Sequence, residues 1–225
     1  MKKSQFIFGM VMCMVFCACE PSTSVSSPDG NLIIECTVDV NGTPMYQVSF
    51  NGQQVITPSP LGLQLAQTDL SQGFTLQRTQ CHRHNETWET TWGEDRYIVN
   101  QYNQLSLFLS HSSGVEMQIC FRAFNDGWAM RYILPELTDT ILMQECTSYQ
   151  FAQAPTVWSI PWETEYYEAL WQPASMSTLD TVCSPITLQW GDSLYAWMHE
   201  AALYDYPAQN YYYANGQLRT FLTPW

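Results

Sequence analysis

Residues 117–132 read MQICFRAFNDGWAMRY, and this stretch contains the pattern that decides the fold class. Met117, Ile119 and Phe121 recur with a period of two, which is the period of a β-strand that buries one face. Asn125-Asp126-Gly127 follows and supplies residue types that favour turns. Arg122 and Arg131 flank that turn, and we expect one of them to pair with Asp126 or Glu94 and hold it. The stretch therefore predicts β-structure closed by a tight turn.

The same two-residue period recurs on both sides of this stretch. Asn51-Gly52 follows an alternating run and is the strongest two-residue hairpin signal. No stretch shows the 3.6-residue period over more than three turns, and residues 163–171 are the best candidate for a short helix. The alternating sets are Tyr46, Val48 and Phe50; Leu61, Leu63 and Leu65; Leu105, Leu107 and Leu109; and Ile186, Leu188 and Trp190. The sequence predicts an all-β fold, a large antiparallel β-sandwich with few short helices.

Composition limits the classes of partner. The 225 residues are 46% hydrophobic, so the chain can bury a sizeable core. Acidic residues number 21 against 8 Lys and Arg, which gives a formal net charge of −13. Such a surface repels nucleic acid and anionic lipid, but it is compatible with neutral sugars and divalent cations. A role of the charge in solubility alone is the other interpretation.

The N-terminus predicts export. Residues 1–19 combine Lys2-Lys3 with a short apolar run and end in Cys17-Ala18-Cys19, which resembles the lipobox of bacterial lipoproteins. We therefore expect Cys19 to be lipidated in a periplasmic or outer-membrane lipoprotein; secretion with cleavage nearby is the alternative. Residues 20–27 are interpreted as a polar tether, and residues 28–225 as the folded domain.

Neither cysteine nor histidine spacing predicts a zinc site. Five of the eight cysteines follow residue 19, and none forms a Cys-x-x-Cys pair. One or two disulfides and free thiols both remain open. His199-Glu200 is not a zincin motif, because position 203 is Leu. His82 and His84 share one face of a predicted strand without a third adjacent ligand, so we interpret them as surface histidines.

A second group of motifs lies in the C-terminal third. Residues 158–162 read WSIPW, residues 166–168 read YYE, and residues 198–206 read MHEAALYDY. Together with residues 85–132, these motifs resemble the N-terminal domain of glycoside hydrolase family 97, bacterial enzymes that act on α-glucosides and α-galactosides. The resemblance covers nearly all of residues 28–225.

This resemblance implies a β-supersandwich akin to that of galactose mutarotase, packed on a catalytic (β/α)8 barrel. In the family the barrel supplies both catalytic carboxylates, and the N-terminal domain lends a glutamate to an active-site calcium ion. Carried onto this sequence, Glu168 is the first choice for that ligand and Glu200 the second. Aromatic faces suit the C–H patches of sugars, and Trp158, Trp162, Tyr167 and Trp171 are the expected wall of the carbohydrate cleft.

The resemblance also bears on activity. Residues 221–225, FLTPW, resemble the junction into the barrel. No catalytic residue is therefore assigned, and the chain alone is expected to be inactive on oligosaccharides with α-linked glucose or galactose. A stand-alone glycan-binding surface lipoprotein is the alternative. Independent mutarotase-like catalysis is disfavoured, because His199 and Glu200 would face opposite sides of a strand.

Overall fold

The computed structural model describes residues 22–135, 140–163, 168–204 and 206–223, and regular structure in them is almost entirely β. The eight-stranded sheet has the order β1-β2-β3-β4-β12-β19-β18-β15. Its strands are β1 (Ser24–Ser26), β2 (Leu32–Val38), β3 (Pro44–Phe50), β4 (Gln53–Pro60), β12 (Ser148–Phe151), β19 (Gln217–Thr223), β18 (Ala208–Ala214) and β15 (Val182–Cys183).

Three smaller sheets complete the fold. One four-stranded sheet contains β10 (Trp128–Ile133), β9 (Glu116–Ala123), β8 (Tyr97–His111) and β7 (Phe74–Glu89). The other contains β14 (Gln172–Ser175), β13 (Thr156–Ser159), β16 (Ile186–Trp190) and β17 (Leu194–Met198). A three-stranded sheet contains β11 (Leu142–Glu145), β5 (Leu63–Leu65) and β6 (Asp69–Leu70), and Met176–Thr178 form the 3₁₀ helix η1.

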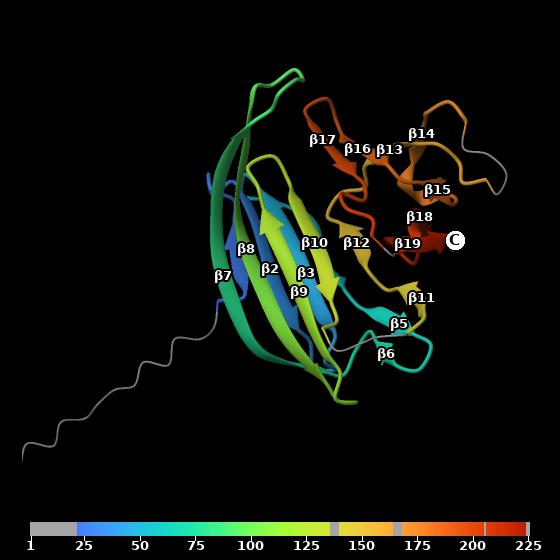
Figure 1. The fold of residues 1–225 in the computed structure, drawn as a ribbon. Coiled ribbons are helices and arrows are strands. Elements are labelled where there is room, and N and C mark those ends of the chain that lie inside the picture. Colours follow the sequence, from blue (N-terminus) through green and yellow to red (C-terminus); the bar gives the residue numbers. More distant parts are fainter. Residues whose placement is uncertain (1–21, 136–139, 164–167, 205, 224–225) are drawn as a thin grey trace, which may run out of the picture.

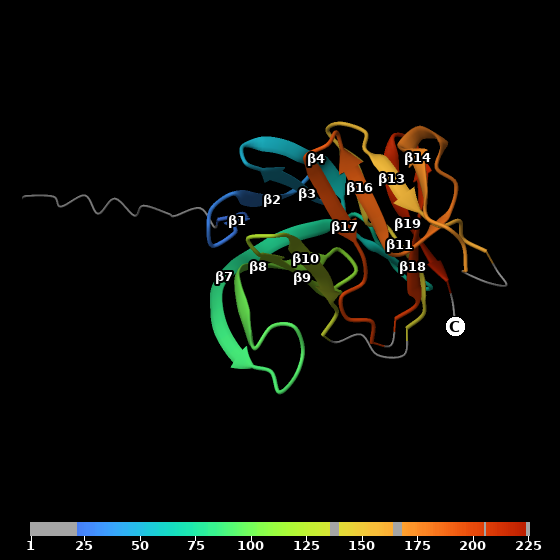
Figure 2. The same ribbon diagram turned by 90° about the horizontal axis from the view of Figure 1, so that it is seen from above.

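Both four-stranded sheets pack against the eight-stranded sheet. Tyr46 of β3 lies 5.8 Å from Phe121 of β9 between ring centroids, and Phe151 of β12 lies 5.6 Å from Trp190 of β16. One core cluster of buried side chains extends through these sheets. Figures 1 and 2 show the long, curved β7 and β8 on one side of the molecule, and on the other side the sheet of β14, β13, β16 and β17, called the β13–β17 sheet below. The antiparallel sandwich is confirmed.

The alternating residues of the sequence form this core. Leu105, Leu107 and Leu109 of β8 are at most 3% exposed, and Met117, Ile119 and Phe121 of β9 are at most 2% exposed. Because strand side chains alternate between faces, these residues lie on one side of the sheet and turn toward the large sheet. The period-two pattern thus predicted which face is buried.

The hairpin prediction at Asn51-Gly52 is also confirmed. Asn51 has φ 50° and Gly52 has φ 75°, and the two residues connect β3 to β4. Positive φ at both central positions is what a type I′ turn requires, and its twist matches the flanking strands.

Two local predictions need correction. The tether predicted for residues 20–27 includes Ser24–Ser26, which form β1 and pair antiparallel with Ile33 to Glu35 of β2. Val25 is 6% exposed, so this short segment is held by an apolar contact as well as by backbone pairing. The helix suggested for residues 163–171 falls partly outside the described residues; Glu163 and residues 168–171 have no helical structure.

Two further findings concern cysteines and membrane spans. Sequence alone left both disulfides and free thiols open for the five cysteines after residue 19. All five are free thiols: Cys36, Cys81, Cys120, Cys146 and Cys183. In the described part of the chain, no helix is long and apolar enough to cross a membrane. Cys19 lies outside the described residues.

Candidate functional site

The segment between β13 and β14 carries most of the predicted site residues, and Trp162 is the first of them. Pro161 forms an isolated bridge with Val182, and the Trp162 amide donates to the Thr181 carbonyl at 3.0 Å. These bonds hold Trp162 against β19, where its ring meets Phe221 edge-on at 5.2 Å between centroids. Trp162 is half-buried as a result, and it lies beside the strand that leads to the C-terminal end of the described chain.

Glu168 and Trp171 lie just before β14. Glu168 is exposed, and Trp171 is 44% exposed. Neither side chain is enclosed by the described residues. Tyr167, the remaining residue of the predicted aromatic wall in this segment, lies outside the described residues.

Glu200, the second candidate ligand, has a structural partner. It lies just after β17, is half-buried, and accepts a hydrogen bond of 2.6 Å from the Gln209 amide. Burial raises the pKa of Glu200, while the bond from Gln209 opposes the rise. The carboxylate therefore ties the segment after β17 to the start of β18.

A third carboxylate, Glu145, was missed by the sequence reasoning. It is 7% exposed at the end of β11. The Tyr206 hydroxyl donates to its Oε2 at 2.6 Å, and the Gln209 side-chain amide donates to its Oε1 at 3.3 Å. Burial raises the pKa of Glu145. Because Gln209 bonds both Glu145 and Glu200, the two carboxylates belong to one network that fixes the MHEAALYDY segment.

No sequence rule singles out Glu145. It occurs in the short run Gln144-Glu145-Cys146, which has no motif or spacing of chemical interest. Its importance comes from Tyr206 and Gln209, which are more than 60 residues away in sequence. The signal available was Tyr206 itself, the last residue of the MHEAALYDY segment, since the hydroxyl of a buried tyrosine usually finds a hydrogen-bond partner.

The described residues contain no cluster of three or more His, Cys, Asp or Glu side chains that could hold a metal ion. Calcium takes six to eight oxygen ligands, so a single accessible carboxylate such as Glu168 fits only as one member of a larger set.

Trp158 lies on a different surface from Trp162. It projects from the outer face of the β13–β17 sheet, where its indole Nε1 donates to Gln189 Oε1 at 2.8 Å. Trp162 instead packs on Phe221 of β19. The four predicted wall residues are thus divided: Trp162 and Trp171 flank the segment that contains Glu168, whereas Trp158 belongs to the outer face of the sheet.

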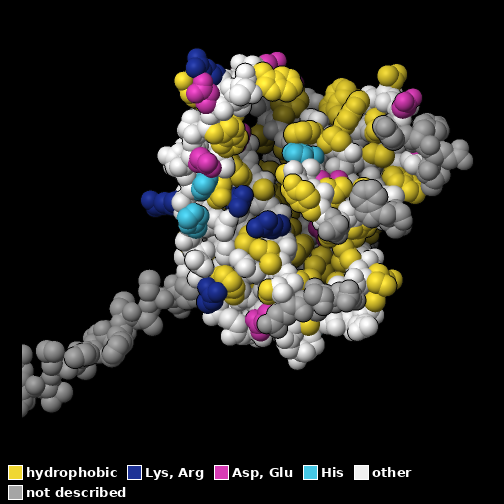
Figure 3. Space-filling view, in the orientation of Figure 1, with side chains coloured by type: hydrophobic (Ala, Val, Ile, Leu, Met, Phe, Trp, Pro, Cys, Tyr) yellow, Lys and Arg dark blue, Asp and Glu magenta, His cyan; other side chains and the backbone are white. Residues whose placement is uncertain are grey.

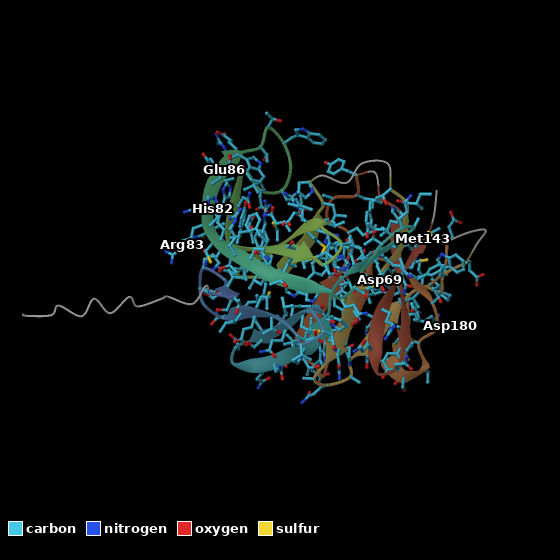
Figure 4. All side chains as sticks on the ribbon, turned by 90° about the horizontal axis from the view of Figure 1, so that it is seen from below. Asp69, His82, Arg83, Glu86, Met143 and Asp180 are labelled. Carbon is cyan, nitrogen blue, oxygen red and sulfur yellow. The ribbon has the colours of Figure 1, made fainter. Side chains whose placement is uncertain are left out.

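His82 and His84 share a face of β7, as expected. Their ring centroids are 6.5 Å apart, and His84 stacks on Tyr102 of β8 at 4.8 Å and contacts Glu86 at 3.3 Å. Figure 4 shows His82, Arg83 and Glu86 along the β7 edge, on the side of the molecule opposite Asp180. This cluster is therefore a surface feature of the long hairpin.

The arginine prediction was wrong in its partners. Arg122 donates from Nε to Gln104 Oε1 at 3.0 Å, and its guanidinium lies 4.4 Å from the ring centroid of Tyr102. Among the described residues, the ion pairs are His84–Glu86 and Arg96–Glu89, so neither Arg122 nor Arg131 pairs with Asp126 or Glu94 there. Arg122 instead packs along β8 beside its cross-strand partner.

Comparison with known proteins identifies relatives of this architecture. The chain is 29% identical over 163 residues to a retaining alpha-galactosidase of Bacteroides thetaiotaomicron, a match that covers 72% of this chain and 24% of that protein. It is 28% identical over 133 residues to a probable retaining alpha-galactosidase of Streptomyces bingchenggensis, covering 59% of this chain and 20% of that protein. The chain thus spans about a quarter of the curated relatives it matches.

Solved structures point to the same family as the sequence relatives. A Glycoside Hydrolase Family 97 enzyme from Pseudoalteromonas sp. strain K8, in complex with acarbose, superposes with a TM-score of 0.84 and 29% identity over 90% of this chain and 32% of that one. A beta-arabinopyranosidase shares the fold, with a TM-score of 0.79 at 22% identity. The family description Glycosyl-hydrolase 97 N-terminal matches residues 25–225, and the chain therefore belongs to the glycoside hydrolase family 97 N-terminal domains.

Proposed function

We propose that this chain serves as the non-catalytic N-terminal domain of an exported α-glycosidase, anchored through Cys19. In this role it packs on a catalytic barrel and lends a calcium ligand and aromatic side chains to a carbohydrate site. The observation that carries the proposal is the family match over residues 25–225, combined with relatives of which the chain spans about a third or less. The expected substrate is an oligosaccharide with α-linked glucose or galactose.

The two candidate ligands differ in what surrounds them. Glu200 already accepts the Gln209 amide and is half-buried in the network with Glu145, so its carboxylate acts within this domain. Glu168 is exposed and lies between Trp162 and Trp171 in sequence. Calcium binds several oxygen ligands, and in a site shared with the barrel a glutamate of this domain has to be accessible to the barrel. We therefore assign Glu168 as the donated ligand, and Glu200 to the hydrogen bond that ties the segment after β17 to β18.

The aromatic contribution follows from the same geometry. The Trp162 and Phe221 rings are 5.2 Å apart between centroids, next to the C-terminal end of the described chain, and Trp171, which follows Glu168 closely in sequence, is accessible. A barrel that continues from this end would meet these side chains first. The apolar C–H faces of a sugar ring would pack against these aromatic rings, and the sugar hydroxyl groups would form hydrogen bonds elsewhere.

Calcium calorimetry tests this assignment. The chain alone should give no binding heat, since the described residues supply no complete ligand set. A longer protein that includes the barrel should bind calcium, and Glu168→Gln should weaken that binding at least tenfold. Glu200→Gln is the matched control, and we expect it to lower the unfolding temperature more than the calcium affinity. Unchanged calcium affinity in Glu168→Gln would remove Glu168 from the site.

A further inference from the structure

The outer face of the β14–β13–β16–β17 sheet carries an ordered set of aromatic and uncharged polar side chains. The register places Pro173, Trp158, Thr187 and Trp197 in one row across the four strands. A second row, two residues away along each strand, consists of Ser175, Thr156, Gln189 and Tyr195. Side chains in such rows project from the same face. The opposite face buries Val157 and Leu188, which are at most 1% exposed, so these two rows face outward.

Three aromatic rings on this face are accessible. Trp158 is 37% exposed, Tyr195 is 55% exposed and Trp197 is 61% exposed. Trp158 and Trp197 are two strands apart, which corresponds to about 10 Å between their Cα atoms. Figure 2 looks down onto this sheet, and Figure 3 shows apolar side chains gathered in the region of β13, β16 and β17. The aromatic area is wider than a single pyranose ring.

Hydrogen bonds hold Trp158 and Tyr195 in place, and ring stacking holds Trp197. Gln189 accepts from the Trp158 indole at 2.8 Å, and its amide nitrogen donates to the Tyr195 hydroxyl at 3.1 Å and to the Gly191 carbonyl at 2.9 Å. The Trp197 ring is stacked on His199, with 4.0 Å between centroids. Side chains fixed before binding lose less conformational entropy when a ligand arrives. Tyr195 accepts from Gln189, so its own hydroxyl proton is available to a ligand.

The chemistry of this face fits a sugar better than a protein partner. None of the eight positions in the two rows carries a charge, although the protein as a whole has a net charge of −13. Four of them, Thr156, Ser175, Thr187 and Gln189, carry hydroxyl or amide groups. Permanent protein interfaces have a more continuous apolar core than this. Aromatic ring faces and uncharged hydrogen-bonding groups on one surface match the C–H patches and hydroxyls of a carbohydrate.

We propose that the outer face of the β14–β13–β16–β17 sheet is a carbohydrate-binding platform that holds a neutral oligosaccharide chain. Trp197 and Trp158 stack against pyranose rings, and the Tyr195 hydroxyl donates to a sugar oxygen. Gln189 positions both Trp158 and Tyr195. The platform uses no residue of the proposed calcium site, so it does not depend on that assignment.

Titration calorimetry with maltoheptaose, an oligosaccharide of α-linked glucose, tests the platform. The chain is titrated in the presence of EDTA, which removes any contribution from calcium. We expect saturable binding that Trp197→Ala and Tyr195→Ala each weaken at least tenfold, with Tyr195→Phe intermediate. Trp92→Ala is the matched control, because Trp92 is 89% exposed but lies between β7 and β8. Thermal unfolding verifies that the variants are folded, as expected for side chains that are more than half exposed.

Three calorimetric results would overturn the proposal. They are the absence of binding at millimolar maltoheptaose, equal binding by wild type and Trp197→Ala, and an equal loss in Trp92→Ala. Hydroxyl-radical footprinting of a longer protein with its barrel gives a further test. If Tyr195 and Trp197 were protected there without sugar, the face would be a contact between domains. Glu168→Gln should leave the maltoheptaose titration unchanged, so failure of the calcium assignment is distinguishable from failure of the platform.

Discussion

Burying a carboxylate costs free energy of folding unless hydrogen bonds or an opposite charge compensate. Glu145 is a buried carboxylate of this domain. Its two hydrogen bonds, from Tyr206 and Gln209, reduce the cost but do not cancel it, since burial still raises its pKa. A folded-state pKa above the unfolded value means that folding favours the protonated acid. The stability that this provides is fully present below the unfolded pKa and is lost as the pH rises through the folded pKa.

Replacing Glu145 by Gln should therefore change the pH dependence of stability. We expect wild type to lose unfolding free energy relative to Glu145→Gln as the pH rises from 4.5 toward 7. The slope is limited to about 1.4 kcal/mol per pH unit, the value for a single proton. Urea unfolding of both proteins at several pH values measures the difference. Parallel stability curves for the two proteins would show that Glu145 does not titrate differently in the folded state.

At the scale of single elements, the turn between β2 and β3 docks on the start of β7. The Phe74 amide donates to the Gly42 carbonyl at 2.9 Å, and the Gly73 amide donates to the Asn41 carbonyl at 2.9 Å. Gly42 has φ +79°, and a Cβ added there would lie only 2.5 Å from the Phe74 nitrogen. The turn thus needs glycine for two reasons, its backbone conformation and its closeness to β7.

Gly30 allows the cost of the backbone conformation to be measured without the cost of the close approach. It has φ +80°, but an added Cβ would meet nothing within 4 Å. We expect Gly30→Ala to cost about 1–2 kcal/mol for the left-handed conformation alone. Gly42→Ala should cost about 1–3 kcal/mol more, because the backbone of β7 has to shift. Denaturant unfolding of the two variants measures both values. Equal losses would show that the close approach of the turn to β7 contributes nothing.

The elements were predictable from sequence where local pattern determines them. Leu105 to Leu109 and Asn51-Gly52 are examples, because side-chain period and turn conformation depend on neighbouring residues. The division of strands among four sheets was not predictable, since it depends on partners distant in sequence. β12, for example, pairs with both β4 and β19. The same reason hid the Glu145 network and the Gln189 contacts, whereas Glu168 and Glu200 were found only through family resemblance.

At the scale of the whole molecule, the domain leaves large apolar side chains almost fully exposed. Leu170 is 81% exposed and Tyr204 is 84% exposed. Both occur near predicted site residues in sequence, Leu170 beside Trp171 and Tyr204 in the MHEAALYDY segment. Where such side chains belong to a larger contiguous apolar patch, the patch marks an interaction surface. In the proposed role, the catalytic barrel covers this surface in the longer protein.

Sedimentation velocity tests whether this surface needs a partner. The chain alone should associate at micromolar concentration, whereas the double variant Leu170→Ser with Tyr204→Ser should sediment mainly as a monomer. Val40→Ser is the matched control, because Val40 is fully exposed but lies next to the β2–β3 turn, and this change should leave the association unaltered. A wild-type chain that remains monomeric throughout would mean that these side chains are tolerated in water. The domain would then be stable without a barrel, as the stand-alone glycan-binding alternative requires.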